Sequence, residues 1–135
     1  MKTHPYIRAY LAGIAIPTPL LLFMMTVFIL ARFVYNVPVP IERAIAFPMA
    51  VIPNAWGLWN VLYVVLQQRK QYPIGLHGAF LPLLLVPAGL LMAALLQIDL
   101  LTPAMAAAGL PFAMAVYYLA WKYLVGFCNH LVGVA

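Results

Sequence analysis

One short segment of this chain concentrates the side chains that could bind a ligand in apolar surroundings. At about 100° per residue in a helix, the side chains of Trp56, Trp59, Asn60 and Tyr63 fall within a sector of roughly 100° and form one amide and aromatic face. Such a face can line a cavity for an apolar ring, an amphipathic molecule or a lipid headgroup. It can equally anchor the helix at an interface, with Asn60 bonded to another helix. The residues themselves leave both interpretations open.

His77 is the histidine that lies inside a long apolar run. Histidine titrates near physiological pH and ligates metals, but His4 and His130 both lie outside the runs that we assign to membrane spans. We therefore predict neither a metal site nor a cofactor. The default expectation is a hydrogen-bonded His77 beside two glycines, with a histidine triad as the less favoured alternative.

Tyr118 shares a helix face with Tyr117 and Trp121. Aromatic residues near the end of an apolar run are typical of the membrane interface, and we favour such a belt over the wall of a pocket. With Tyr118 the candidate ligand-binding set is complete: Trp56, Trp59, Asn60, Tyr63, His77 and Tyr118.

Prolines interrupt every apolar run. Each interior proline removes one hydrogen bond within its helix and displaces a carbonyl, and in lipid the freed carbonyl must find another partner. The kinks that result can either shape helix packing, which we favour, or produce broken helices that line a solute site. The residues concerned are Pro17, Pro19, Pro48, Pro53, Pro82, Pro87 and Pro111.

The sequence offers no recognisable catalytic constellation, and we lean against an enzyme. Serine is absent, the single Cys128 has no positioned base, and the carboxylates Glu42 and Asp99 both fall in predicted connections. A four-span chain of about this length invites comparison with small multidrug transporters, but those depend on a glutamate within the first helix. The first run here contains no acidic residue, which argues against proton-coupled cation export.

The elements that must position these residues are membrane-spanning helices. Apolar residues make up 67% of the chain and charged residues 7%, far from the usual values of about 45–50% and about 25%. A bilayer core requires about 20 apolar residues per helix, and four runs satisfy this length. We predict an all-α integral membrane protein, a bundle of four helices each kinked by proline. It forms a single domain over 1–135, with spans at about 7–32, 44–66, 74–97 and 103–127.

The fourth span has a recognisable start and an ambiguous end. Thr102 is predicted to cap the helix, and Pro103 occupies the first helical position, where a missing N–H costs nothing. Beyond Trp121 the chain either continues the span to about 127 or turns along the membrane interface.

Pairs of small residues four positions apart allow close approach between helices of the third and fourth spans. The predicted helix-packing residues are Gly89, Ala93, Ala104 and Ala108. They favour a small polytopic membrane protein that acts through helix packing, as a homo-oligomer or an accessory subunit of a membrane complex. The alternative is a small channel, transporter or protein that binds a lipid or apolar ligand, with its site at the kinked second and third helices.

The net charge of +5 is explained by topology, and we predict no nucleic-acid partner. On one side of a four-span protein would lie five basic residues: Lys2, Arg8, Arg69, Lys70 and Lys122. The first loop carries only Arg32 and Arg43, and the third loop carries Asp99. Because cytoplasmic loops carry the excess of Lys and Arg, we predict the cell (inner) membrane with both termini cytoplasmic.

Labelling of single cysteines in intact cells tests this topology. In a Cys128→Ala background, a cysteine at Val39 should react with an impermeant maleimide, whereas a cysteine at Gln68 should react only after the cells are permeabilised. Labelling of position 68 from outside, with protection of position 39, would reverse the predicted orientation.

Overall fold

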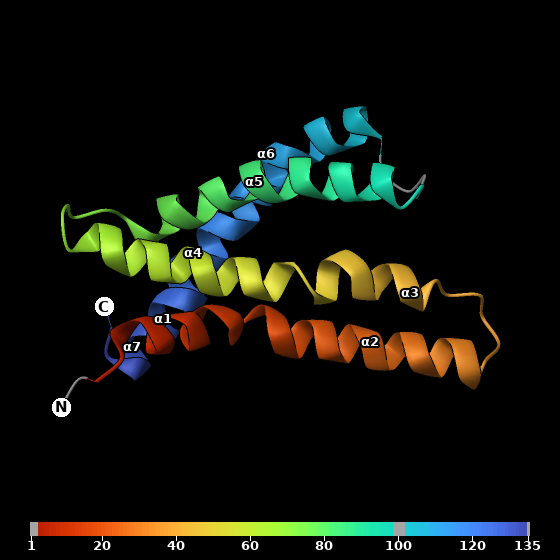
Figure 1. The fold of residues 1–135 in the computed structure, drawn as a ribbon, viewed down its shortest axis with the longest axis horizontal. Coiled ribbons are helices and arrows are strands. Elements are labelled where there is room, and N and C mark those ends of the chain that lie inside the picture. The colour runs from red at the N-terminus through yellow and green to blue at the C-terminus, as the bar shows by residue number, and fades with distance from the viewer. Residues whose placement is uncertain (1–2, 99–101, 135) are drawn as a thin grey trace.

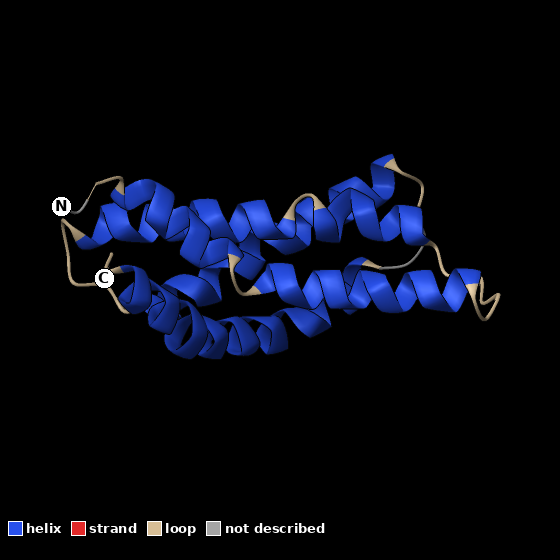
Figure 2. Cartoon of the chain, turned by 90° about the horizontal axis from the view of Figure 1, so that it is seen from below, coloured by secondary structure: helices blue, strands red, loops and turns tan. Residues whose placement is uncertain are grey.

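The computed structural model describes residues 3–98 and 102–134, and their secondary structure is entirely helical. Four helices in this part of the chain are long and apolar enough to cross a membrane (Figures 1 and 2). They are Pro5–Phe33, Ile41–Gln67, Ile74–Leu95 and Pro103–Val132, of 29, 27, 22 and 30 residues. The prediction of four long apolar helices is therefore confirmed. Asp99, which the sequence places in the third loop, lies outside the described residues.

The first two long helices each consist of shorter segments. The first comprises α1, Pro5–Ile14, and α2, Pro17–Phe33, and both segments begin with proline, whose fixed φ suits the first helical turn. The second comprises α3, Ile41–Ala44, a π-helical segment η1, Ile45–Met49, and α4, Ile52–Gln67. The Asn54 side chain stabilises the junction between η1 and α4, because its Nδ2 donates to the Ala50 carbonyl at 2.7 Å.

The third and fourth helices are more continuous. Helix α5, Ile74–Leu95, includes Pro82 and Pro87, and α6, Pro103–Leu119, includes Pro111. The predicted cap is confirmed, because the Met105 N–H donates to Thr102 Oγ1 at 3.2 Å. Beyond Leu119 the helix continues as the π-helical η2, Ala120–Val125, and then as α7, Gly126–Val132. The fourth helix thus runs past the predicted limit of 127, and Gly133, with φ 66°, closes it.

The four helices run back and forth along the long axis of the molecule. In Figure 1, α1 and α2 form one side, α3 and α4 the middle, and α5 with α6 the other side. The fourth helix passes behind the middle, so that α6 packs on α5 while α7 packs on α1. The α4–α5 connection lies at the same end as α1 and α7, and the α2–α3 loop lies at the opposite end.

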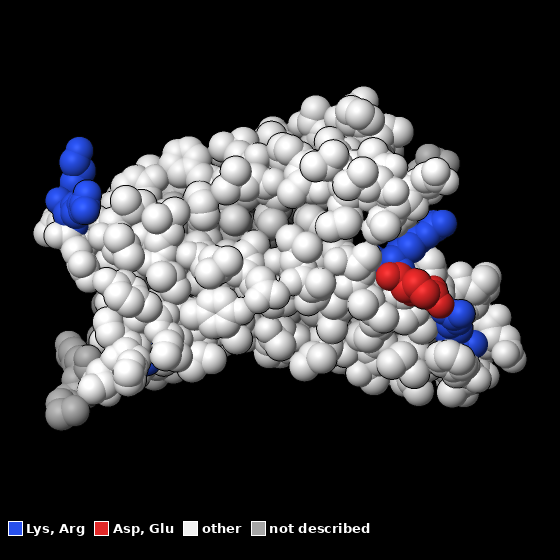
Figure 3. Space-filling model, viewed as in Figure 1, with Lys and Arg blue, Asp and Glu red and all other residues white. Residues whose placement is uncertain are grey.

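Charge is confined to the two ends of the face in Figure 3, and a broad uncharged band separates them. At the end of the α2–α3 loop, Arg32 Nη1 and Glu42 Oε1 form an ion pair of 2.7 Å. The side chains of Arg32 and Glu42 are 37% and 71% exposed, so solvent screens the pair and it contributes little to stability. Glu42 is thus paired with Arg32 and not with its neighbour in sequence, Arg43.

Glycines set the closest helix contacts. A Cβ on Gly13 of α1 would lie 2.5 Å from the Trp56 carbonyl oxygen and 2.8 Å from Gly57 Cα of α4. On α5, a Cβ on Gly78 would overlap the Trp121 ring. Small residues at these points let backbone or a large ring come into direct contact, so the helices approach closely there.

Replacing Gly13 by Ala should destabilise the fold by about 1–3 kcal/mol, because the added methyl group must push α1 away from α4. The matched control is Gly109→Ala, since a Cβ at Gly109 has nothing within 4 Å. That change should alter stability by no more than about 1 kcal/mol. Unfolding in a mixed-micelle SDS titration measures both variants, and equal stability of the two would contradict the role assigned to Gly13.

Candidate functional site

A buried amide pair joins three helical segments at the end that carries α1 and α7. Asn60 Nδ2 donates to Asn129 Oδ1 at 2.6 Å, and Asn129 Nδ2 donates back to Asn60 Oδ1 at 2.9 Å. Asn60 Nδ2 also donates to the Ala9 carbonyl at 2.7 Å. All three residues have 0% exposure. The side chain of Asn60 therefore ties α4 to both α7 and α1.

His77 and Trp59 make a second reciprocal contact, between α5 and α4. Trp59 Nε1 donates to the His77 carbonyl at 2.8 Å, and His77 Nε2 lies 2.8 Å from the Trp59 carbonyl, to which it donates when that nitrogen carries the proton. The two rings stack with centroids 4.8 Å apart. His77 is 2% exposed and is also in contact with the rings of Tyr63, Tyr72 and Trp121. The expectation of a hydrogen-bonded His77 is confirmed.

Trp56 and Trp121 form the centre of the buried apolar core. Their ring centroids are 5.5 Å apart, and Trp56 also packs against Tyr117 at 5.0 Å. Trp56 Nε1 donates to the Tyr117 hydroxyl at 3.3 Å. Trp121 is fully buried, and its Nε1 has no hydrogen-bond partner among the described residues. The expectation that Trp121 belongs to an interfacial belt is therefore wrong, because the hollow at Gly78 admits its ring into the core.

In the structure, the predicted amide and aromatic face of the second helix points into the bundle. Trp56, Asn60 and Tyr63 are buried and Trp59 is half-buried, so these side chains make contacts between helices. Tyr118 is separate from them: it is 36% exposed, its ring covers Gly75, and Lys122 Nζ lies 5.8 Å from the ring centroid. Five of the six predicted residues thus gather in one packed region, and Tyr118 lies at its edge.

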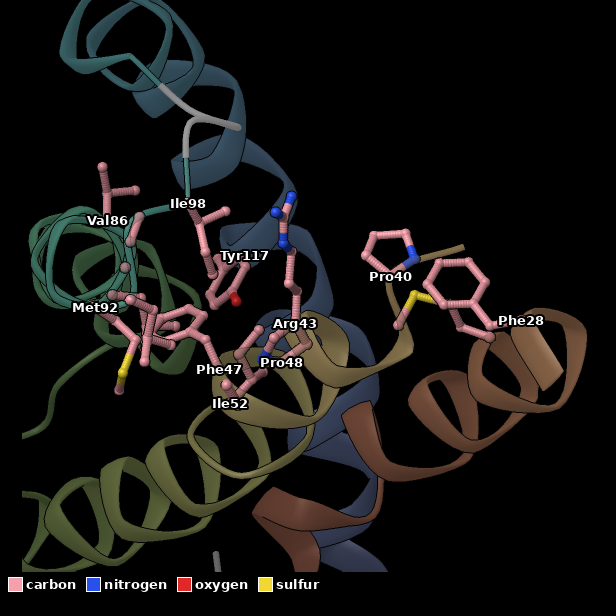
Figure 4. A pocket seen from close by; sticks show the side chains of 16 residues that line it. Phe28, Pro40, Arg43, Phe47, Pro48, Ile52, Val86, Met92, Ile98 and Tyr117 are labelled. Atoms are coloured by element: carbon pink, nitrogen blue, oxygen red, sulfur yellow. The ribbon is translucent and has the colours of Figure 1, made fainter. Parts of the chain in front are cut away.

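A cavity lies away from these residues, toward the α2–α3 loop. It is an apolar groove of about 540 Å³ between α2, the α3–η1 segment, α5 and α6 (Figure 4). Representative lining residues are Phe28, Phe47, Pro48, Val86, Met92 and Tyr117. Arg43 is the one lining residue with a formal charge among those described, and its side chain extends toward Ile98. A space of this size with apolar walls and few polar groups is typical of a ligand site.

The predicted helix-packing residues divide between the groove and the outside. Gly89 and Ala93 line the groove, and a Cβ on Gly89 would meet the Phe47 ring at 3.4 Å. Ala104 and Ala108 are exposed on α6, whereas their neighbour Ala106 is buried. Helices α5 and α6 do pack closely, as predicted for the third and fourth spans, but Ala106 rather than Ala104 or Ala108 is buried.

Sequence reasoning missed Asn129 and the groove. A signal for Asn129 existed, because a second amide in an apolar helix needs a partner, and Asn60 was available. The groove had only a partial signal in Pro48, Pro82 and Pro87, since its shape depends on how far four helices separate. Arg43, at the start of the second helix, gave no indication of facing a cavity.

Other chemistry is limited in the described residues. They contain no group of three or more His, Cys, Asp and Glu side chains positioned to hold a metal ion. A second recess of about 370 Å³ lies at the opposite end from the groove, and it is lined by Pro5, Arg8, Val64, Gln67, Gln68, Gly133 and Val134. The groove, by comparison, has a predominantly apolar lining and the larger volume of the two.

Comparison of the chain with family models, with curated proteins and with solved structures finds no match. The assignment of function therefore depends on the geometry of the groove and of the packed core.

A double-mutant cycle tests the Asn60–Asn129 pair. Asn60→Leu should destabilise the fold by about 1–3 kcal/mol, because it leaves the buried Asn129 amide without its partner and removes the bond that ties α4 to the Ala9 carbonyl. Asn129→Leu should do the same for Asn60. The double variant should lose less than the sum of the single variants, because no half of the pair remains unsatisfied.

The free energies of unfolding come from SDS titration of the purified variants. Strict additivity of the two changes would show that the amides do not act as a pair.

Proposed function

We propose that this chain is an integral membrane protein with four spans, whose prolines kink the helices. The exposed apolar side chains on its outer surface support insertion, because water would solvate them poorly. They include Leu20, Phe23, Leu91 and Phe112, each at least 63% exposed. The confinement of charge to the two ends of the face in Figure 3 fits a bilayer around the uncharged middle.

The membrane that we propose is the cell (inner) membrane. The orientation that we propose places both termini in the cytoplasm. It is supported by the basic residues Arg8, Arg69 and Lys70, which belong to the end of the bundle with α1 and the α4–α5 connection. The groove then lies in the half of the membrane away from the cytoplasm.

The function that the geometry supports best is binding of an apolar or amphipathic molecule within the membrane. One observation carries this proposal: the groove of about 540 Å³ between α2, the α3–η1 segment, α5 and α6. The groove lies beside η1 of the second helix and α5 of the third helix. The packed Asn60 and His77 contacts give the bundle a rigid end, against which the groove can keep its shape.

A second candidate is assembly through helix packing, as a homo-oligomer or an accessory subunit of a membrane complex. The exposed small residues of α6 favour it: Ala104 and Ala108 lie on the surface, and Gly109 has open space where a Cβ would be. A helix of a second copy or of another membrane subunit could approach this surface closely.

Native mass spectrometry of the protein released from detergent separates the two candidates. The wild type should carry a bound amphipathic molecule, whereas Gly89→Leu and Ala93→Leu should lose it, because the larger side chains fill the groove. Ala108→Leu is the matched control on the exposed face of α6 and should retain the bound mass.

A wild-type particle without bound mass would count against the binding proposal. A multimer, or a complex with another subunit, that is lost in Ala108→Leu would favour assembly instead. Identical spectra for all four proteins would remove support from both candidates.

A further inference from the structure

One cationic side chain, that of Arg43, lines the groove among the described residues, and it bears on what the groove binds. Arg43 lies on α3, and its side chain extends along the groove toward Ile98, which follows α5 (Figure 4). Its neighbour Glu42 is paired with Arg32 at 2.7 Å. The charge of that carboxylate is therefore balanced by Arg32, and among the described residues that line the groove Arg43 carries the formal charge.

The groove has the length of one membrane leaflet. Its lining on α5 and just beyond extends from Leu85 to Leu96, which corresponds to about 16 Å at the rise of a helix. This is about half of a hydrocarbon core of roughly 30 Å. The floor lies at Leu85, Ile52 and Tyr117, deep in the bundle, while Arg43 is at the loop end. An occupant would thus have an apolar body in the membrane and a polar group at its surface.

Selectivity must come from that polar group. An acyl chain in the bilayer is already in apolar surroundings, so its transfer to an apolar groove gains little from the hydrophobic effect. A guanidinium, in contrast, makes paired, charge-assisted hydrogen bonds to phosphate oxygens, and the net charge of the headgroup decides how strongly the whole headgroup is attracted. A neutralised headgroup, such as that of a zwitterionic lipid, offers it a weaker net attraction.

We propose that the groove holds one acyl chain of an anionic phospholipid, whose phosphate is bound by Arg43. This inference rests on the proposed binding function and adds the class of ligand. The apolar lining from Leu85 to Leu96 accommodates the chain, and Arg43 selects the headgroup.

The test uses the full-length protein in detergent with equal amounts of dioleoyl phosphatidylglycerol and dioleoyl phosphatidylcholine, and native mass spectrometry counts the bound lipid. The wild type should prefer phosphatidylglycerol. Arg43→Gln should reduce that preference about tenfold, the size expected for the loss of charge-assisted hydrogen bonds. Arg69→Gln removes the same charge from the opposite end and should leave the preference unchanged.

The groove-filling variants distinguish failure of this inference from failure of the proposed function. If Gly89→Leu or Ala93→Leu abolishes binding of both lipids while the wild type and Arg43→Gln bind them equally, the groove binds lipid without headgroup selection and the inference is overturned. If neither lipid binds the wild type above background, the inference and the binding function both fail. An equal loss of preference in Arg43→Gln and Arg69→Gln would assign the effect to overall charge and would also overturn the inference.

Discussion

Burial of polar groups in an apolar bundle is the constraint on which the rest of this structure depends. Asn60 satisfies it by bonding to Asn129 and to the Ala9 carbonyl at the same time, with every partner fully buried. An unpartnered amide at this depth would cost about 1–3 kcal/mol. Helices from the beginning, middle and end of the chain are therefore held in one register, because a sliding movement of any of them would break these bonds.

The two ends of the bundle differ in how their space is filled. At the end with the amide pair, Gly13 lets α1 touch α4, and Gly78 admits the Trp121 ring against α5. The stacked rings of His77 and Trp59 and the packed rings of Trp56 and Trp121 occupy the space between these helices. Toward the α2–α3 loop the helices pack less completely. The Phe47 ring lies beside Gly89, and the groove of about 540 Å³ remains between the helices. Rigid packing at one end and a groove at the other are thus parts of one arrangement.

Each of the two regions contains one π-helical segment: η1 lies at the groove and η2 at the packed core. Segment η1 precedes α4 and contributes Phe47 and Pro48 to the groove, while η2 contributes Trp121 and Val125 to the core. A π-helical turn changes the direction of the side chains that follow it, and such turns are frequent at functional sites. In the fourth helix this lets α6 pack on α5 while α7 reaches α1. The same helix therefore contributes Tyr117 to the floor of the groove and Asn129 to the amide pair.

The sequence by itself determined the number and character of the long helices. Apolar run length, the cap at Thr102 and the prolines at helix starts are local properties, and each has a direct physical cost or benefit within one turn. It also determined that Trp56, Asn60 and Tyr63 share a face, because helical periodicity alone fixes that relation.

Only the tertiary structure decided what these faces meet. The pairing of Asn60 with Asn129, 69 positions away, depends on the path of the fourth helix beyond Trp121, which the sequence left open between two routes. The groove depends on the separation of helices that are far apart in the chain, and no local sequence pattern specifies that separation. Local residue preferences determine where a helix forms, whereas the space between helices is a property of all the side chains that fill it.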